Sequence, residues 1–234
     1  MNEQKKGLNT SGYKRIAIIY LFTLVQTVTF FAAAGRIDLP RAWLLYGLNI
    51  GLTIFNTIIG AKLYPELMNA RGDLKKKNTK SWDIVFMIVY TAMMFVSPVI
   101  AGLDVGRFRW SETSIYWIPL GIVFFFISAV FVDWAMSANT HFETSVRIQK
   151  DRKHAVVSTG PYHVIRHPGY VGMILLYLSF PLIIGSLFVW IPTIVIVVSI
   201  FVRTALEDKT LRNELEGYTN YSNKVRYRLI PGVW

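Results

Sequence analysis

Four long apolar runs, each bounded by charged or polar residues, constrain the fold of this chain more than any other feature of its sequence. They cover roughly 16–34, 42–61, 82–103 and 115–136 of the 234 residues. A bilayer has a hydrocarbon core about 30 Å thick, and a helix needs about 20 apolar residues to cross it. The four runs therefore predict four transmembrane helices.

A fifth apolar stretch, over 170–202, is too long for a single crossing. It contains Pro181, Gly185 and Pro192, and such residues typically end or turn a helix. We therefore expect a helical hairpin that turns near 184–186. The predicted fold is all-α: a polytopic helical membrane protein with about six spans, of which the last two form the hairpin.

The composition agrees with a membrane location. Hydrophobic residues make up 53% of the chain and the mean hydropathy is +0.39, which is too apolar for a soluble domain of this length. The chain has no cysteine, so disulfides, thiolate metal sites and cysteine nucleophiles are excluded. The formal charge of +11 does not favour a nucleic-acid partner, because membrane proteins place Lys and Arg where cytosolic loops meet anionic headgroups.

The basic residues also predict the orientation in the membrane. With an even number of spans both termini fall on one side, and 21 of the 25 Lys and Arg residues lie on that side. They include Lys5, Lys6 and the lysines at 75–77, whereas the other side holds Arg36, Arg41, Arg107 and Arg109. The positive-inside rule therefore places both termini in the cytosol. The membrane would be the inner or plasma membrane of a prokaryote or the endoplasmic reticulum of a eukaryote.

The residues richest in chemistry occupy two segments that the hairpin returns to one surface. The first is the fourth loop, 137–168, and the second is the tail after 203. Pro168 suits a first helical turn, whose free N–H groups can bind a carboxylate. Tyr162 and Tyr170 present flat faces suited to an adenine ring or a sulfonium. Tyrosines at a membrane interface also serve as anchors, and this alternative stays open.

The histidines of this loop do not predict a metal site. His163 and His167 are four residues apart, but Pro168 is incompatible with a helix that carries both. The chain has no H-E-x-x-H pattern and no cysteine ligand. For His167 two interpretations stay open, a ligand contact and a buried histidine with satisfied ring nitrogens.

Arg203 and Glu207 are four residues apart where the last span leaves the bilayer, so they share a helix face. On an ordinary surface helix they would form an ion pair worth a few tenths of a kcal/mol. At this position we expect a site instead. Glu207 would accept hydrogen bonds from a ribose or an ammonium group, and Arg203 would hold a carboxylate in a two-pronged contact.

In their order along the chain, these residues resemble the isoprenylcysteine carboxyl methyltransferases and, more broadly, the membrane methyltransferases that include phospholipid methyltransferases. The resemblance covers roughly 149–231 and divides the chain into N-terminal spans, 1–140, and a methyltransferase-like region, 141–234. It rests on Gly160-Pro161-Tyr162, Arg166-His167-Pro168-Gly169-Tyr170-Val171-Gly172, Arg203-x-x-x-Glu207-Asp208, Tyr218-x-x-Tyr221 and the closing stretch from Val225-Arg226 to Pro231.

The resemblance implies S-adenosylmethionine as methyl donor, S-adenosylhomocysteine as product and no metal. It implies a lipophilic or prenylated acceptor that enters from the bilayer, with Arg203 and Glu207 as catalytic candidates and Arg203 facing the acceptor. Carboxyl O-methylation is the preferred reaction because Arg203 favours an anion. The implied donor pocket consists of Gln149, His154, Ala155, Val156, Val157, Tyr162, His167, Pro168, Gly169, Tyr170 and Glu207.

The chain also departs from the resembled family. Family members commonly carry Ser in place of Gly169, a longer acidic run than Glu207-Asp208, and one more residue between Gly217 and Tyr218. Phospholipid N-methylation and small-thiol S-methylation therefore stay open. Two further alternatives are an NADPH-dependent sterol-type reductase, although no G-x-G-x-x-G is present, and a transporter or scaffold, although the spans carry few ionisable residues.

Overall fold

The computed structural model describes residues 7–73, 78–111 and 113–234. Lys5, Lys6 and the lysines at 75–77, which contribute to the predicted charge asymmetry, lie outside the described residues. Across the described ranges the regular elements are all helical, and the predicted all-α membrane fold is confirmed.

Five helices are long and apolar enough to cross a membrane. They are α1 (Thr10–Ala34), α2 (Pro40–Leu63), α4 (Ser81–Ala101), which continues as the π-helix η1 (Gly102–Phe108), α5 (Trp117–Ala138) and α7 (Trp190–Glu214). The sixth, α6 (Pro168–Ile184), has 17 residues and is shorter. The remaining elements are short: α3 (Pro65–Gly72), η2 (Lys150–Arg152), η3 (Gly160–His163) and α8 (Tyr218–Lys224).

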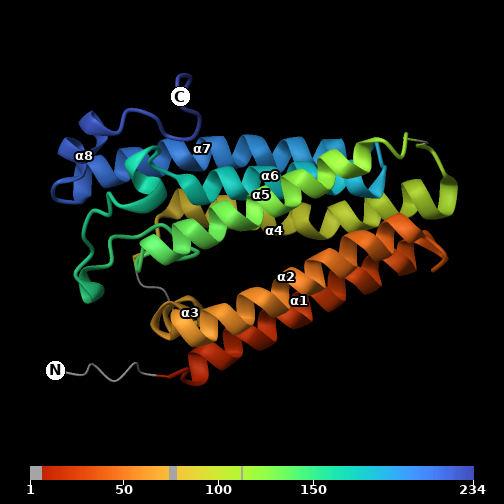
Figure 1. Cartoon of the computed structure of the whole chain (residues 1–234), viewed down its shortest axis with the longest axis horizontal. Helices are drawn as coiled ribbons and strands as arrows, with labels where there is room; N and C mark the ends of the chain where they lie inside the picture. Colours follow the sequence, from red (N-terminus) through yellow and green to blue (C-terminus); the bar gives the residue numbers. More distant parts are fainter. Residues whose placement is uncertain (1–6, 74–77, 112) are drawn as a thin grey trace.

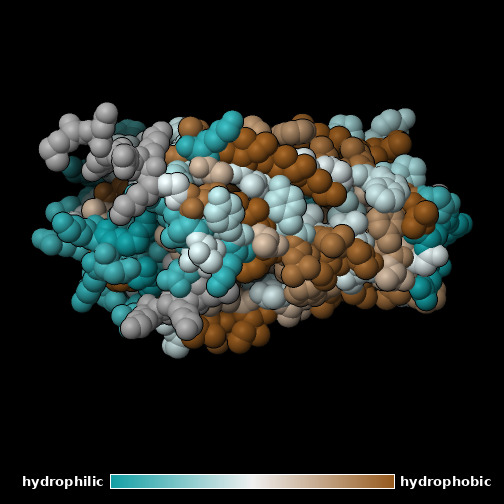
Figure 2. All heavy atoms as spheres, turned by 90° about the horizontal axis from the view of Figure 1, so that it is seen from below, coloured by the Kyte–Doolittle hydropathy of each residue, from teal (hydrophilic) through white to brown (hydrophobic). Residues whose placement is uncertain are grey.

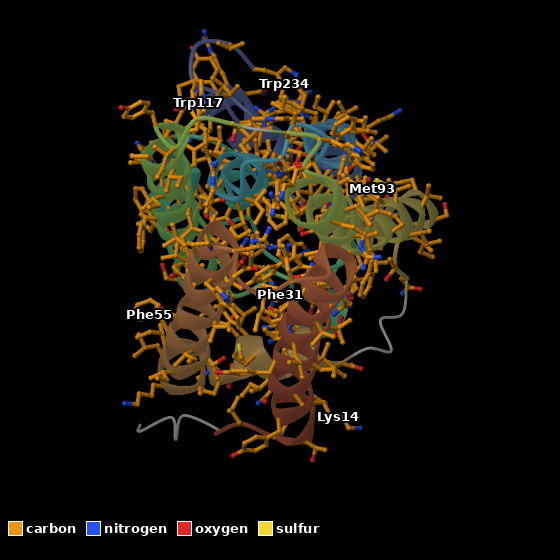
Figure 3. All side chains as sticks on the ribbon, turned by 90° about the vertical axis from the view of Figure 1, so that its right-hand side faces the viewer. Lys14, Phe31, Phe55, Met93, Trp117 and Trp234 are labelled. Carbon is orange, nitrogen blue, oxygen red and sulfur yellow. The ribbon has the colours of Figure 1, made fainter. Side chains whose placement is uncertain are left out.

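The long helices form two groups that lie side by side. In Figure 1, α1 and α2 run together along one side of the molecule and α4 to α7 along the other; Figure 3 shows the same separation along the length of the bundle. The start of α1, α3 and α8 lie at the same end, which we call the pocket end. Figure 2 shows hydrophilic residues at this end and a broad hydrophobic band across the middle. A band of this kind is what lipid chains require.

The predicted hairpin is present and turns where expected. α6 ends at Ile184, Gly185 follows with a φ of 86°, and α7 begins at Trp190. A positive φ of this size favours glycine. The Arg41 side chain donates to the carbonyl oxygens of Leu182 and Ile183 at 3.0 and 2.8 Å. These carbonyls would otherwise lack partners at the end of a helix in an apolar medium.

Close contact between α5 and α6 sets the position of the site. A Cβ at Gly172 would lie 2.7 Å from a methyl of Val132 and 2.8 Å from the carbonyl oxygen of Ser128. Only a residue without a side chain allows this approach. The first turn of α6 is thereby held against α5, next to the loop that leaves α5 at the pocket end.

Candidate functional site

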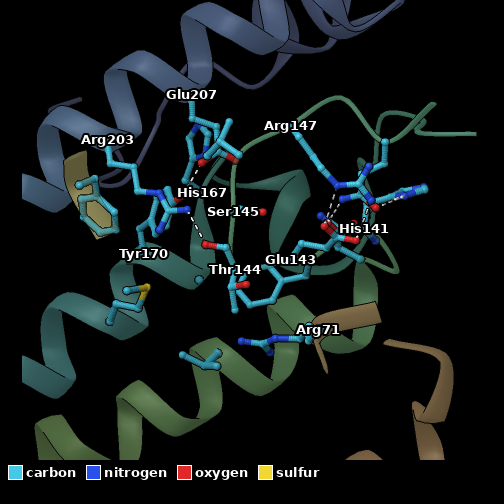
Figure 4. Close-up of a pocket in the computed structure, with 18 of the residues that line it drawn as sticks. Arg71, His141, Glu143, Thr144, Ser145, Arg147, His167, Tyr170, Arg203 and Glu207 are labelled. Carbon is cyan, nitrogen blue, oxygen red and sulfur yellow. Dashed lines mark hydrogen bonds and ion pairs between the residues drawn. The ribbon is translucent and has the colours of Figure 1, made fainter. Parts of the chain in front are cut away.

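A cavity of about 580 Å³ lies at the pocket end, between α1, α3 and α4 on one side and α6, α7 and the loop over 139–157 on the other. Pockets for small molecules have volumes of about 300–1,000 Å³. Except for Pro168, all the predicted site residues line it: Gln149, His154, Ala155, Val156, Val157, Tyr162, His167, Gly169, Tyr170, Arg203 and Glu207. The loop and the tail, distant in sequence, therefore meet in one cavity (Figure 4).

Pro168 has a structural place beside the cavity. It is the first residue of α6, as predicted, and it is buried. The backbone N–H groups of Arg166 and His167, just before it, donate to the carbonyl oxygens of Tyr227 and Arg228 at 2.9 and 3.0 Å. The C-terminal tail is therefore fastened along the start of the helix.

Three tyrosines form an aromatic cup in the wall of the cavity. Tyr162, Tyr218 and Tyr221 pack together with Val156 and Val157. The Tyr221 hydroxyl donates to the carbonyl oxygen of Tyr162 at 2.7 Å, which fixes the cup to η3. Burial raises the pKa of Tyr162, so this phenol stays a neutral hydroxyl. Flat faces with fixed polar edges suit a planar heterocycle.

Glu207 and His167, which also line the cavity, both contact Tyr170. The Tyr170 hydroxyl donates to the Glu207 carboxylate. The His167 ring lies nearly parallel to the Tyr170 ring, with 5.7 Å between centroids and 12° between planes. Nε2 of His167 is buried and lies 3.6 Å from Oδ1 of Asp208, beyond normal hydrogen-bond distance. Glu207, His167 and Tyr170 therefore belong to one part of the cavity wall.

Arg203 is only 6% exposed and is held by partners other than Glu207. Its Nε lies 2.9 Å from Oδ1 of Asp83, and its Nη2 donates to the carbonyl oxygen of Thr144 at 2.8 Å. Its guanidinium also lies over the Phe86 ring, 4.3 Å from the centroid. Arg203 and Glu207 share a helix face as predicted, but a surface pair does not describe them.

Sequence reasoning missed Asp83, the partner of Arg203. Asp83 is fully buried in the first turn of α4 and also accepts a hydrogen bond from the backbone N–H of Val146 at 2.6 Å. A carboxylate inside an apolar run is rare and calls for a partner, and that signal was available. The identity of the partner, 120 residues away, was not.

Sequence reasoning also missed the residues that order the loop over 139–157. The Glu143 carboxylate pairs with Arg147 at 3.1 Å, and Arg147 pairs in turn with Asp151 at 2.7 Å. Gln149 donates through Nε2 to the carbonyl oxygen of His141 at 2.8 Å. Burial, together with the neighbouring His141, lowers the pKa of His154 to about 4, so its ring is neutral near pH 7.

Glu207 lines the cavity, whereas its neighbour Asp208 holds the surrounding elements together. Asp208 points away from the cavity and binds Arg166 through two contacts, at 2.7 and 3.2 Å. It also accepts hydrogen bonds from Tyr218 at 3.0 Å and from Arg228 at 3.0 Å. Asp208 therefore ties α7 to the loop before α6, to α8 and to the tail, while Glu207 faces the cavity.

The fold and this cavity fit a multi-pass helical membrane protein with a large cavity at one end of its bundle. Residues 116–216 match the model of a family described as phospholipid methyltransferase. The matched segment contains α5, the loop, α6 and α7, which supply most of the polar cavity wall. No protein of curated function matches the chain. The family match and the apolar helices support a membrane methyltransferase.

Proposed function

We propose that this protein is a membrane methyltransferase that uses S-adenosylmethionine and methylates the carboxylate of an isoprenylcysteine-like or other lipophilic acceptor. One observation carries the proposal. The same cavity joins a tyrosine-rich polar part to an apolar extension between α1 and α4. A soluble, charged donor and a membrane-dissolved acceptor need these two environments in contact with each other.

The polar part fits the donor. Tyr162, Tyr218 and Tyr221 would enclose the adenine, and the segment His154–Val157 would line its edge. Glu207 would accept hydrogen bonds from the ribose or the ammonium group. Gln149 and Gly169 complete this wall, and Pro168 contributes by starting α6. When bound, the donor supplies an activated methyl group on a positively charged sulfur.

The apolar extension fits an acceptor chain. It is lined by Ile18, Ile19, Phe22, Met87, Met94 and Leu176. Ile18 is also 37% exposed on the outer surface of α1, so the extension borders the region that lipid occupies. A chain dissolved in the bilayer can therefore reach the cavity without entering water.

Methyl transfer to a carboxylate requires the protein to align the two substrates and to exclude water from them. A carboxylate is already ionised near neutral pH, so its oxygen attacks the methyl carbon while the S–C electron pair leaves with sulfur and no proton moves. The opposite charges of carboxylate and sulfonium are lost together in this step. Arg203 and Tyr170 would order the wall where the two substrates meet.

We further propose that the pocket end faces the cytosol. Most of the described Lys and Arg residues belong to segments at this end, and the positive-inside rule places such segments in the cytosol. The donor would then enter from the cytosol and the acceptor from the bilayer. Cysteine accessibility labelling tests this orientation, since the protein has no native cysteine. A cysteine introduced at Lys209 should react with an impermeant thiol reagent only from the cytosolic side.

Ligand-induced thermal stabilisation in detergent tests the donor class. S-adenosylhomocysteine should raise the unfolding temperature, because a ligand that binds the folded state stabilises it. NADPH serves as the comparison, since a sterol-type reductase would bind it instead. Stabilisation by NADPH and not by S-adenosylhomocysteine would overturn the proposal.

Labelled-methyl transfer tests the acceptor class. Extracted membrane lipids, small acids, small thiols and prenylcysteine analogues are offered together with the labelled donor. A carboxyl methyl ester loses its label in mild base, whereas methylated amines and thioethers keep it. A base-stable product would favour phospholipid N-methylation or thiol S-methylation over our proposal.

Matched variants test the site. Glu207→Gln should abolish methyl incorporation, whereas Glu216→Gln, the same change on an exposed side chain outside the cavity, should not. Arg203→Gln alone would leave the buried Asp83 charge unpaired, so it is combined with Asp83→Asn. The double variant should fold and lose activity. Full activity in Glu207→Gln would remove Glu207 from the site.

A further inference from the structure

Arg71 lines the cavity but does not belong to the proposed donor-binding residues. It lies on α3, and two contacts fix α3 to the start of α1. The Asn69 side chain accepts from the backbone N–H of Asn9 at 2.9 Å. A Cβ at Gly72 would lie 1.9 Å from the carbonyl oxygen of Ser11, so only glycine allows the helices to come this close.

These contacts place Arg71 beside Arg15 of α1, and both residues line the cavity. Figure 4 shows Arg71 pointing into the cavity below Thr144 and Glu143, on the side opposite Arg203. Tyr90 and Arg203 line the same cavity as Arg15 and Arg71. The two cationic regions therefore border one common space.

The charge of Arg71 is poorly neutralised. Its Nη1 contacts the Met136 sulfur at 3.0 Å, and its guanidinium lies 5.5 Å from the centre of the Phe142 ring. Its Nε is buried and has no hydrogen-bond partner among the residues that the structure describes. Glu143 attracts it, but this carboxylate pairs with Arg147 at 3.1 Å and Arg152 at 3.5 Å.

Burial, together with the positive charge of Arg15, lowers the pKa of Arg71 to about 9. Arg71 therefore still carries its charge near pH 7. Arg71 is half-buried overall, but its Nε–H is buried and unsatisfied, which is costly, and a bound anion removes that cost. The Nε of Arg203 likewise has no hydrogen-bond partner among the described residues, but Arg203 differs in charge, because Asp83 lies 2.9 Å away and neutralises it.

We propose that Arg71, assisted by Arg15, binds the negatively charged group of the methyl acceptor. That group is a carboxylate or phosphate attached to an apolar chain that lies along Ile19, Phe22 and Met94. The inference rests on the proposed function and names its acceptor-recognition residues. Arg15 and Ile19 are four residues apart on α1, so the charged group and the start of the chain lie along one helix face.

The guanidinium fork matches the oxygens of a carboxylate or a phosphate, and charge-assisted hydrogen bonds of this kind are strong when water is excluded. Arg203 then acts as a positioning residue that holds Tyr170 and Thr144 in place. The acceptor would be selected by Arg71 at its charged end and by α1 and α4 along its chain.

Direct binding tests this assignment independently of turnover. A prenylcysteine carboxylate and its neutral carboxamide are compared by thermal stabilisation and competition, in the wild type and in Arg71→Met, Arg71→Lys and Arg15→Gln. Lys14→Met, an exposed neighbour outside the cavity, is the control. A single-chain phosphate lipid forms a second arm, which separates a carboxylate acceptor from a phosphate-bearing one.

The wild type should prefer the anion over the carboxamide, and Arg71→Met should weaken anion binding about 10- to 100-fold while binding the carboxamide equally well. Arg71→Lys should recover part of the preference. In turnover, KM for the acceptor should rise while kcat changes little, and stabilisation by S-adenosylhomocysteine should persist. If Arg71→Met fails to fold, Arg71→Lys and Arg15→Gln carry the test.

An unchanged preference for the anion in the Arg71 variants, or no preference in the wild type, would overturn the assignment. The proposed function fails differently, through absence of S-adenosylhomocysteine binding in the wild type. Anion preference that depends on Arg71 without donor binding would keep the anion site and remove the methyltransferase.

Discussion

Replacing Asp208 by Asn should destabilise the protein strongly, because Asp208 neutralises a buried cation. The side chains of Asp208 and Arg166 are 1% and 2% exposed, and they are joined by contacts of 2.7 and 3.2 Å. Removing one member of a buried pair leaves the other charge uncompensated, at a cost of about 3–5 kcal/mol. Arg166 keeps hydrogen bonds to the carbonyl oxygens of Val225 and Arg226, so we expect a loss of about 3 kcal/mol.

Thermal unfolding in detergent, followed by tryptophan fluorescence, measures this loss. At about 2–4 °C per kcal/mol for a chain of this size, Asp208→Asn should lower the midpoint by about 6–12 °C. Asp151→Asn is the matched control, because its carboxylate is 61% exposed and Arg147, whose side chain is 9% exposed, keeps its pair with Glu143. A pair with an exposed carboxylate contributes about 0–1 kcal/mol, so this variant should unfold near the wild-type temperature.

A double variant decides whether the unpaired charge is the cause. Arg166→Met combined with Asp208→Asn removes the cation as well, and its midpoint should lie above that of Asp208→Asn alone. The reasoning is wrong if Asp208→Asn unfolds at the same temperature as Asp151→Asn. It is also wrong if the midpoint of the double variant falls by the sum of the shifts of Arg166→Met and Asp208→Asn.

Three further outcomes follow from the cavity wall. Gly169→Ser should weaken S-adenosylhomocysteine binding several-fold, measured by titration, because a Cβ there would lie 2.5 Å from the Phe142 ring. Gly172→Leu should lower the unfolding midpoint through its clash with Val132, at about 1–3 kcal/mol. The pKa of His154 is about 4 in the folded protein and about 6.5 when unfolded, so the unfolded state takes up the proton first. Stability should therefore fall as pH drops from about 6.5 to 4, and His154→Gln should flatten this part of the midpoint-against-pH curve.

Local sequence patterns were enough to locate the long apolar helices and the hairpin. Hydropathy over about 20 residues is a property of one segment, so the membrane-crossing helices could be located without knowing their neighbours. Gly185 and Pro168 act through their own backbone geometry, and they end and start helices where predicted. The charged end of α7 likewise singled out Arg203 and Glu207 as cavity residues.

Partners across the bundle were decided only by the tertiary structure. The sequence placed Arg203 and Glu207 on one helix face with separate roles, but only the structure shows that Asp83 on α4 contacts Arg203 and that Tyr170 on α6 contacts Glu207. In the sequence, Arg71 is one of many basic loop residues. Only the structure shows that Gly72 lets α3 pack against α1 and that Arg71 then lines the cavity. An ion pair or an unpaired charge depends on distances between helices, and those distances follow from side-chain packing that no single segment contains.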